Sequence, residues 1–296
     1  MKQIRIATTQ FSLNSIESSE EFYEKSLGLV AEAAAKGAIA ILLPEYFSLA
    51  QVTLPPKHPL QGKENFHARL RRWDEEHRTE FLGKFQQVAQ KEDIWIIAGT
   101  VPTQEGGKLL NRCYIFSPQG KILHQDKIHM TRFEKEEWKV DAGVPALHVF
   151  TIAGMKCAVN ICYDVEFPQL SQALLKEKID LLLVPSCTDD IHGYWRVRHC
   201  AQARAIENQA YIAVASIVGG QKKFPELESH YGQAGVFSPC DTIFPEQGIL
   251  AEGILNKEAL LVVELDLSAL QEVRKSGTVL NLADGGENSA PQIIQG

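Results

Sequence analysis

Three residues that lie far apart in the sequence have side chains suited to covalent catalysis. Cys162 ends an apolar run that begins at Met155, and turn-like residues follow it. Glu45 follows a second apolar run, and Lys127 comes just after a short strand-like stretch. Because each residue lies at or just past the end of an apolar run, all three can meet at one edge of a layered α/β fold, where such proteins place their ligands.

The chemistry that these side chains support is nucleophilic attack by sulfur. A free thiol with a pKa of ~8.5 is only a few per cent thiolate at pH 7, so a nucleophilic cysteine needs a base or a positive neighbour. Glu45 can take the proton of Cys162. Lys127 can lower the pKa of the thiol and then hold the negative oxygen of a tetrahedral intermediate, aided by the backbone N–H of Tyr163. One such donor typically lowers the barrier by ~2.7–4 kcal/mol.

Other interpretations of the same residues stay open at this point. A cysteine after an apolar run is often inert core, and Glu45 and Lys127 can be surface charges. A cysteine hydrolase that uses Cys162 with His129 or His199 is a second enzymatic hypothesis. A non-hydrolytic interaction module is a third, although such a module has no need of all three residues.

The elements that must position these residues alternate between strand-like and helix-like segments. Four helices are predicted, over residues 18–36, 67–91, 168–178 and 193–208; the first begins with a capping box formed by Ser18 and Glu21 and ends at Gly37. Apolar runs predict strands over residues 4–9, 38–43, 94–100, 113–116, 121–125, 147–151, 156–161, 179–184, 211–216, 235–237, 249–254 and 260–265.

This alternation favours layered α/β packing. About a dozen strands would make one large sheet, so two sheets packed face to face with helices outside are also possible, and periodicity does not choose between the two layouts. We expect one domain over residues 1–275. Residues 276–296 are polar and weakly patterned and are expected to form a C-terminal arm, either disordered or packed on a partner subunit.

Composition limits the classes of function. The chain has 296 residues, of which 45% are hydrophobic and 23% charged, as in ordinary globular proteins. A net charge of −7 argues against binding to nucleic acid. No apolar stretch approaches the ~20 residues that span a bilayer. The first residues lack the pattern of a signal peptide, and the six cysteines contain no C-x-x-C pair. A cytoplasmic protein with no membrane association is therefore expected.

The local sequence around the three residues carries a family resemblance. Residues 43–47 (Leu-Pro-Glu-Tyr-Phe), 127–130 (Lys-Ile-His-Met) and 160–164 (Asn-Ile-Cys-Tyr-Asp) resemble, in this order, the three signature segments of the nitrilase superfamily of carbon–nitrogen hydrolases. The resemblance extends to Phe167-Pro168, Asn111, Pro118, Gly120, Asp141-Ala142-Gly143, Ala203-Arg204-Ala205, Glu207-Asn208 and Tyr211, and thus covers roughly residues 4–266.

This resemblance implies a fold and a set of roles. The fold would be a four-layer αββα sandwich of two mixed β-sheets with outer helices, paired into homodimers or larger homo-oligomers. Glu45 matches the general base of the family, Lys127 its oxyanion-stabilising lysine and Cys162 its nucleophile. Glu134 matches a second glutamate that positions the substrate or the lysine; otherwise it is a charge on a helix surface. No cofactor is implied.

The implied reaction is the hydrolysis of a small amide or N-carbamoyl compound through a cysteine thioester, with release of ammonia or an amine. Tyr163-Asp164 resembles the amidase and carbamoylase branches, whereas nitrilases usually have Trp-Glu there, so amide cleavage is favoured over nitrile cleavage. Many amidase-like members have arginine where this chain has Glu166. That change favours an amine-bearing substrate or places Glu166 against another subunit.

Substrate contacts are expected on the segment after another apolar strand, residues 179–184. The candidates are Asp189, Asp190, His192 and Trp195; the alternative is a polar loop followed by a helix. A zinc site made by His192, His199 and Cys200 would match no familiar ligand spacing, so no metal is predicted.

Overall fold

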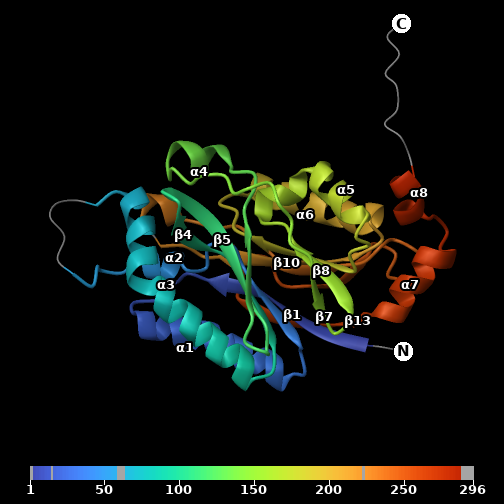
Figure 1. The fold of residues 1–296 in the computed structure, drawn as a ribbon, viewed down its shortest axis with the longest axis horizontal. Helices are drawn as coiled ribbons and strands as arrows, with labels where there is room; N and C mark the ends of the chain where they lie inside the picture. The colour runs from blue at the N-terminus through green and yellow to red at the C-terminus, as the bar shows by residue number, and fades with distance from the viewer. Residues whose placement is uncertain (1–2, 15, 59–63, 222–223, 288–296) are drawn as a thin grey trace, which may run out of the picture.

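The computed structural model describes residues 3–14, 16–58, 64–221 and 224–287. Its β-strands lie in two layers between two pairs of helices (Figure 1). The helices α1 (Ser19–Ala35) and α3 (Phe66–Lys91) cover one side, and α5 (Pro168–Leu175) and α6 (Ile191–Glu207) cover the other. This is the predicted αββα sandwich.

The strands of the two layers follow the predicted apolar runs closely. The first layer holds β1 (Gln3–Ser12), β2 (Ala40–Leu43), β3 (Trp95–Ala98), β4 (Val101–Glu105), β5 (Lys108–Phe116), β6 (Ile122–Asp126) and β13 (Ala259–Asp266). The second holds β7 (Phe150–Ile152), β8 (Met155–Val159), β9 (Leu181–Ser186), β10 (Tyr211–Val218), β11 (Gly235–Phe237) and β12 (Ile249–Glu252). Both layers mix parallel and antiparallel pairs.

The two layers are not separate sheets, because hydrogen bonds join all 13 of these strands into one network. The junction is β1. One edge of β1 pairs with β13 along its length, whereas the other edge pairs with β2 at Ile6–Thr8 and with β10 at Gln10–Ser12. β1 therefore passes from one layer toward the other, and the sheet is curled around this strand.

All four residues of β2 are apolar, and the reason is that both faces of this strand are buried. Ala40 and Leu42 belong to the core that also holds strands of the second layer, whereas Ile41 and Leu43 pack with residues of α1 and α3. Both faces of the strand are covered, and all four side chains are buried. The strand that leads to Glu45 is therefore fixed from two sides.

The predicted start of α1 is confirmed. The Ser18 hydroxyl accepts a hydrogen bond from the N–H of Glu21 at 3.1 Å. The Glu21 carboxylate accepts in turn from the N–H of Glu17, one residue before the cap, at 2.8 Å. Gly37, with φ 80°, follows the helix in the left-handed conformation that glycine adopts without strain.

Several elements were not predicted. They are the strand β4 and the short helices α2 (Leu49–Val52), α4 (Arg132–Glu136), α7 (Leu267–Ser276) and α8 (Asn281–Glu287), together with the 3₁₀ helices η1 (Cys162–Glu166) and η2 (Pro225–Leu227). Within the expected arm, α8 contacts α5, α6 and α7 of the same chain, so this part is an ordered helix, and its packing on a partner subunit stays a prediction. Residues 288–296 lie outside the described residues, and the boundary at residue 275 stays a prediction.

Across the described ranges, no helix combines the length and the apolar character needed to cross a bilayer.

Candidate active site

The ends of β2, β6, β8 and β9 meet at a pocket of about 520 Å³. Glu45 follows β2, Lys127 follows β6 and Cys162 follows β8, and all three side chains line this pocket with Glu134 of α4. The structure therefore brings together the four residues that the sequence singled out for catalysis.

Glu45 is almost fully buried, and both of its carboxylate oxygens are engaged. Oε1 accepts hydrogen bonds from the Lys127 ammonium and from the Asn111 amide, each at 2.8 Å. Oε2 accepts from the backbone N–H of Cys187 at 3.0 Å. The backbone before Glu45 packs so tightly that a Cβ on Gly99 would lie 1.9 Å from the carbonyl oxygen of Pro44, so only glycine fits there.

Glu134 is the second carboxylate beside the Lys127 ammonium, at 2.6 Å. It also accepts hydrogen bonds from the N–H and the hydroxyl of Thr131, both at 2.9 Å, and from the Tyr46 hydroxyl at 3.0 Å. Thr131 and Glu134 form the capping box of α4, which fixes the carboxylate at the start of the helix. Glu134 is thus a buried partner of Lys127 and not a surface charge.

The three buried charges shift one another's pKa values in opposite directions. Burial raises the pKa of Glu45, and the charge of Glu134 adds to this, so the attraction of Lys127 is outweighed. Burial opposes the charge of Glu134 as well, but Lys127 and the hydrogen bonds from Thr131 hold the pKa of Glu134 below its ordinary value. Burial alone would lower the pKa of Lys127, yet the two carboxylates raise it well above the ordinary lysine value.

Cys162 begins η1 in a left-handed backbone conformation, with φ 47°. Such a conformation costs a non-glycine residue of order 1–3 kcal/mol and is found mainly at functional sites. The thiol donates to the carbonyl oxygen of Cys187 at 3.7 Å and accepts from the Ser186 hydroxyl at 3.4 Å. Tyr163 is the second residue of η1, and the first N–H groups of a helix have no partner within it.

The resting thiol of Cys162 is neutral. Burial raises its pKa, and the negative charge of Glu45 raises it further, although Lys127 and the hydrogen bond from Ser186 act in the opposite direction. The expectation that Lys127 lowers the pKa of the thiol is therefore right in direction but outweighed in sum. Attack by sulfur requires that its proton leave during the reaction, and Glu45 is a neighbouring acceptor.

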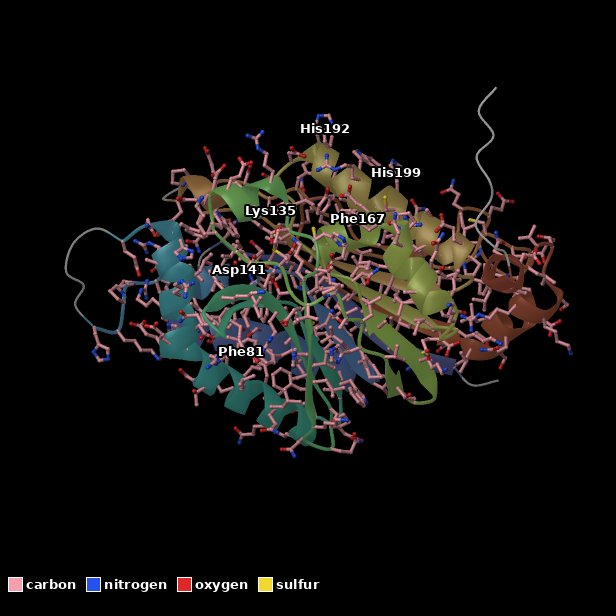
Figure 2. The ribbon with its side chains drawn as sticks, turned by 45° about the horizontal axis from the view of Figure 1, so that its top comes forward. Phe81, Lys135, Asp141, Phe167, His192 and His199 are labelled. Atoms are coloured by element: carbon pink, nitrogen blue, oxygen red, sulfur yellow. The ribbon has the colours of Figure 1, made fainter. Side chains whose placement is uncertain are left out.

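Asp164 links the loop that carries Lys127 to the loop that carries Cys162. Its carboxylate accepts from the backbone N–H groups of Ile128 at 3.1 Å and His129 at 2.8 Å, and lies 3.0 Å from Nδ1 of His129. The ring of His129 also stacks on Phe167, with centroids 3.7 Å apart. Figure 2 shows Phe167 beneath α6, near the middle of the molecule.

The four expected substrate contacts divide into two pairs. Asp189 and Asp190 line the pocket, and Asp190 also caps α6 by accepting from the N–H of Gly193 at 2.6 Å. His192 and Trp195 do not line it, because the first turns of α6 direct these side chains outward. Figure 2 shows His192 at the outer surface of α6.

The two histidines of the Cys–His hypothesis do not line the pocket that holds Cys162. The imidazole of His129 is engaged by Asp164 and Phe167, and His199 stacks on Trp195 on the outside of α6. The pocket contains a different histidine, His230, which no sequence pattern indicated.

The pocket residues Tyr46, Thr131, Cys187 and His230 were also missed as functional candidates, as was Ser186, which donates to the Cys162 sulfur from outside the pocket lining. One signal was available, because Thr131-x-x-Glu134 has the spacing of a capping box. Tyr46 lies within the signature segment 43–47, which did not indicate its own role, and Ser186, Cys187 and His230 belong to no recognisable pattern. Among the described residues, no group of three or more histidine, cysteine, aspartate or glutamate side chains is arranged to hold a metal ion.

The fold and the pocket agree with the relationships of the sequence. Residues 5–275 match the carbon–nitrogen hydrolase family, and the chain belongs to this family.

Its relatives include a probable hydrolase, YhcX of Bacillus subtilis, which is 32% identical over 282 residues that make up 95% of this chain and 53% of that protein. The chain thus spans about half of the length of YhcX. The omega-amidase NIT2 of Xenopus tropicalis is 28% identical over 286 residues, covering 93% of each chain.

Among solved structures, an amidase from a Nesterenkonia species matches with a TM-score of 0.72 and 22% identity, covering 91% of this chain and 92% of that chain. A mutant of the amidase from Nesterenkonia sp. AN1, in which acrylamide has added to the active-site cysteine, matches with a TM-score of 0.71 and 22% identity over 92% of this chain and 96% of that chain. At this identity, these two likenesses concern the fold.

Proposed function

We propose that this protein is an amidase that hydrolyses the C–N bond of a small linear amide or N-carbamoyl compound through a thioester on Cys162. The observation that carries the proposal is the buried group of Glu45, Lys127 and Glu134 beside a neutral thiol in one pocket. An interaction module would have no use for a buried lysine held by two carboxylates, because burying charges is costly unless they serve a purpose.

The first half of the reaction forms the thioester. The Cys162 sulfur attacks the carbonyl carbon while its proton passes to Glu45, whose raised pKa suits it to act as a base. The oxygen of the tetrahedral intermediate takes up negative charge, which the Lys127 ammonium and the N–H of Tyr163 stabilise. Glu45 then returns the proton to the leaving nitrogen, and ammonia or an amine departs.

The second half of the reaction hydrolyses the thioester. Glu45, again unprotonated, removes a proton from a water molecule that attacks the thioester carbonyl carbon. The same two donors stabilise the second tetrahedral intermediate. When it collapses, the C–S bond breaks, the carboxylic acid leaves, and Glu45 returns its proton to the sulfur. Glu134 holds Lys127 in position throughout and is a positioning residue.

The relatives support this choice of reaction. The name of NIT2 describes an omega-amidase, and the solved neighbours are described as amidases with an active-site cysteine. Another of these structures shows the acetamide moiety of fluoroacetamide attached covalently to the cysteine. We extend amide hydrolysis, and not nitrile hydrolysis, to this chain.

We also propose that the protein acts in the cytoplasm and assembles as a homodimer or higher homo-oligomer. The cysteines of the described residues are free thiols, which supports a reducing compartment such as the cytoplasm. Exposed apolar side chains on α6 support pairing into a homodimer or higher homo-oligomer.

Ammonia release from a panel of ω-amides, N-carbamoyl amines, aliphatic amides and nitriles tests the reaction. We expect turnover of an amide or carbamoyl compound that Cys162→Ala abolishes and Cys240→Ala leaves intact, because Cys240 is exposed and lies outside the pocket. Glu45→Gln and Lys127→Met should each lower kcat/KM by about 10²-fold or more. Thermal unfolding of each variant separates lost chemistry from a lost fold.

Two outcomes would contradict the proposal. If no member of the panel turns over in a Cys162-dependent way, the interaction module is favoured. If folded Glu45→Gln keeps most of its activity, the base is another residue.

A further inference from the structure

The pocket beside Cys162 has an excess of negative charge. Six acidic side chains line it against three basic ones. Each basic side chain already has a carboxylate partner: Lys127 has Glu45 and Glu134, Arg132 lies 2.8 Å from Glu136, and Arg196 lies 3.6 Å from Glu166. Among the described residues, carboxylates thus outnumber cations in the pocket, and this balance of charge favours a cationic substrate group over an anionic one.

Asp189 is an exposed carboxylate at the pocket, and the described residues offer it no hydrogen bond or ion pair, so solvent or a ligand is its partner. Its loop is nevertheless fixed on both sides. Thr188 accepts from the N–H of Tyr231 at 2.8 Å and donates through its hydroxyl to the Tyr231 carbonyl at 2.6 Å, and Asp190 caps α6. A fixed acceptor whose described neighbours offer no donor is preorganised to receive a hydrogen-bond donor from the substrate.

His230 lies on the same side of the pocket and is only 8% exposed. Its Nδ1 lies 3.0 Å from the carbonyl oxygen of Gly219, and since a carbonyl only accepts, Nδ1 carries the proton. Burial lowers the pKa of His230, so the ring is neutral and Nε2 is an acceptor. No residue in the described part of the chain donates to Nε2. Thr188 and Tyr231, the chain neighbours of Asp189 and His230, are joined by two hydrogen bonds, so the two acceptors come from adjacent segments of the pocket wall.

We propose that the substrate carries an ammonium group at the end remote from its amide, and that Asp189 and His230 bind this group. The inference rests on the proposed amidase function and specifies the substrate class as an ω-amino amide. An ammonium has three donors and no acceptor, so it satisfies the carboxylate and the neutral imidazole together. A carboxylate at the same position would face two acceptors in a negative field, and a methyl group would offer no donor to the buried His230 and would leave Asp189 to solvent.

Binding to a variant that cannot turn over tests this inference separately from catalysis. Cys162→Ser would be titrated calorimetrically with three amides of nearly equal length: 5-aminopentanamide, hexanamide and glutaramate. These end in an ammonium, a methyl and a carboxylate group. We expect 5-aminopentanamide to bind about 10-fold tighter than hexanamide, as for a hydrogen-bonded charge that is partly screened by solvent, and glutaramate to bind weakest.

The residue assignment is tested in the same background. Asp189→Asn and His230→Phe should each remove most of the advantage of 5-aminopentanamide while leaving the affinity for hexanamide within about twofold. Glu246→Gln is the matched control, because Glu246 is an exposed carboxylate outside the pocket. In the active enzyme, Asp189→Asn should raise KM for 5-aminopentanamide with little change in kcat.

The outcomes separate the two proposals. Equal or tighter binding of hexanamide or glutaramate overturns the inference and leaves the amidase function standing. An unchanged preference in Asp189→Asn likewise overturns it. Cys162-dependent turnover of none of these amides, nor of the wider panel, overturns the proposed function, whatever the binding preference.

Discussion

Two carboxylates share the Lys127 ammonium, and their surroundings give them different properties. Glu134 receives hydrogen bonds from Thr131, Tyr46 and Asn111 in addition to Lys127, so its ionised form is strongly favoured. Glu45 has fewer donors, is fully buried and faces the charge of Glu134. A pair of acids whose pKa values move apart in this way commonly divides its work, with one acid as the fixed charge and the other as the proton acceptor.

Glu134→Gln should change the pH profile of the enzyme in a defined direction. Glu45 acts as a base only when it is unprotonated, so activity is lost as the pH falls through its pKa, which in the wild type lies above the ordinary glutamate value. Removing the charge of Glu134 removes a repulsion that raises this pKa. The acidic limb of kcat/KM should therefore move to lower pH, and kcat should fall because Glu45 is a weaker base.

The control for this change is Glu137→Gln, an exposed carboxylate that follows the same short helix. The acidic limb of kcat/KM for Glu137→Gln should coincide with that of the wild type. An acidic limb that moves upward in Glu134→Gln would contradict the division of roles.

At this scale, the sequence predicts the residues proposed to do chemistry better than the residues that hold them in place. Cys162, Glu45 and Lys127 stand at the ends of apolar runs and within signature segments. The hydrogen-bond partners Tyr46 and Ser186 depend on how separate strands are aligned, which no local pattern reports. His230 lies in the loop between η2 and β11, and no sequence motif around it indicates a function.

Between elements, the important connection is Asp164. This side chain belongs to η1 but bonds to the segment that joins β6 to α4, and so fixes Lys127 relative to Cys162. Gly143 tightens the same segment from the other side, donating its N–H to the Lys127 carbonyl at 2.9 Å, where a Cβ would lie 2.6 Å from the Cβ of Asp126.

Asp164→Ala should therefore impair both stability and catalysis. It leaves the buried N–H of Ile128 without an acceptor, at a cost of about 1–3 kcal/mol, and the half-buried N–H of His129 at a smaller cost. We expect a lower unfolding temperature and a kcat reduced about 10-fold or more, since small displacements of catalytic groups have large effects on rate.

Asp164→Asn distinguishes the hydrogen bonds that Asp164 accepts from the effect of its negative charge. Its carbonyl oxygen can still accept from one N–H, so it should recover part of the unfolding temperature and of kcat. The measurements are thermal unfolding and kcat for both variants. If Asp164→Ala is destabilised but turns over at the wild-type rate, the bridge between the two loops does not position the catalytic groups.

The elements themselves were predictable where the physical signal is strong. Long apolar runs and the capped helices α1 and α3 are found near their predicted limits. β4 was missed because it contains Pro102 and ends in polar residues, as edge strands do. His192 and Trp195 were misplaced because sequence does not report which side of α6 faces the pocket.

For the whole molecule, the number of strands and the family resemblance predict the four layers. They do not predict that hydrogen bonds join the two strand layers into one sheet. The layers join because β1 pairs with β2 through one half and with β10 through the other. Such a junction depends on the relative shift of three strands from distant parts of the chain. It matters for function, because it places the ends of β2 and β9 at the same pocket.

Helix α6 carries the apolar side chains through which we propose that two copies of the chain pair. Ile191, Trp195 and Ile206 are exposed on α6, and at 3.6 residues per turn they fall within roughly 60° around the helix axis. If this face pairs with a second copy of the chain, Trp195→Glu places a charge at the centre of the contact and should convert the homodimer to a monomer. Sedimentation equilibrium measures the change in mass, and thermal unfolding shows whether the fold is kept.

Ile243→Glu is the matched control, because Ile243 is 50% exposed and lies on the loop between β11 and β12, not on α6. This variant should remain a dimer. A Trp195→Glu variant that keeps the mass of the wild type would rule out this face as the contact, and a monomeric wild type would rule out the assembly. Because Trp195 lies outside the pocket, the affinity of the dissociated variant for 5-aminopentanamide then measures whether pairing affects the substrate site.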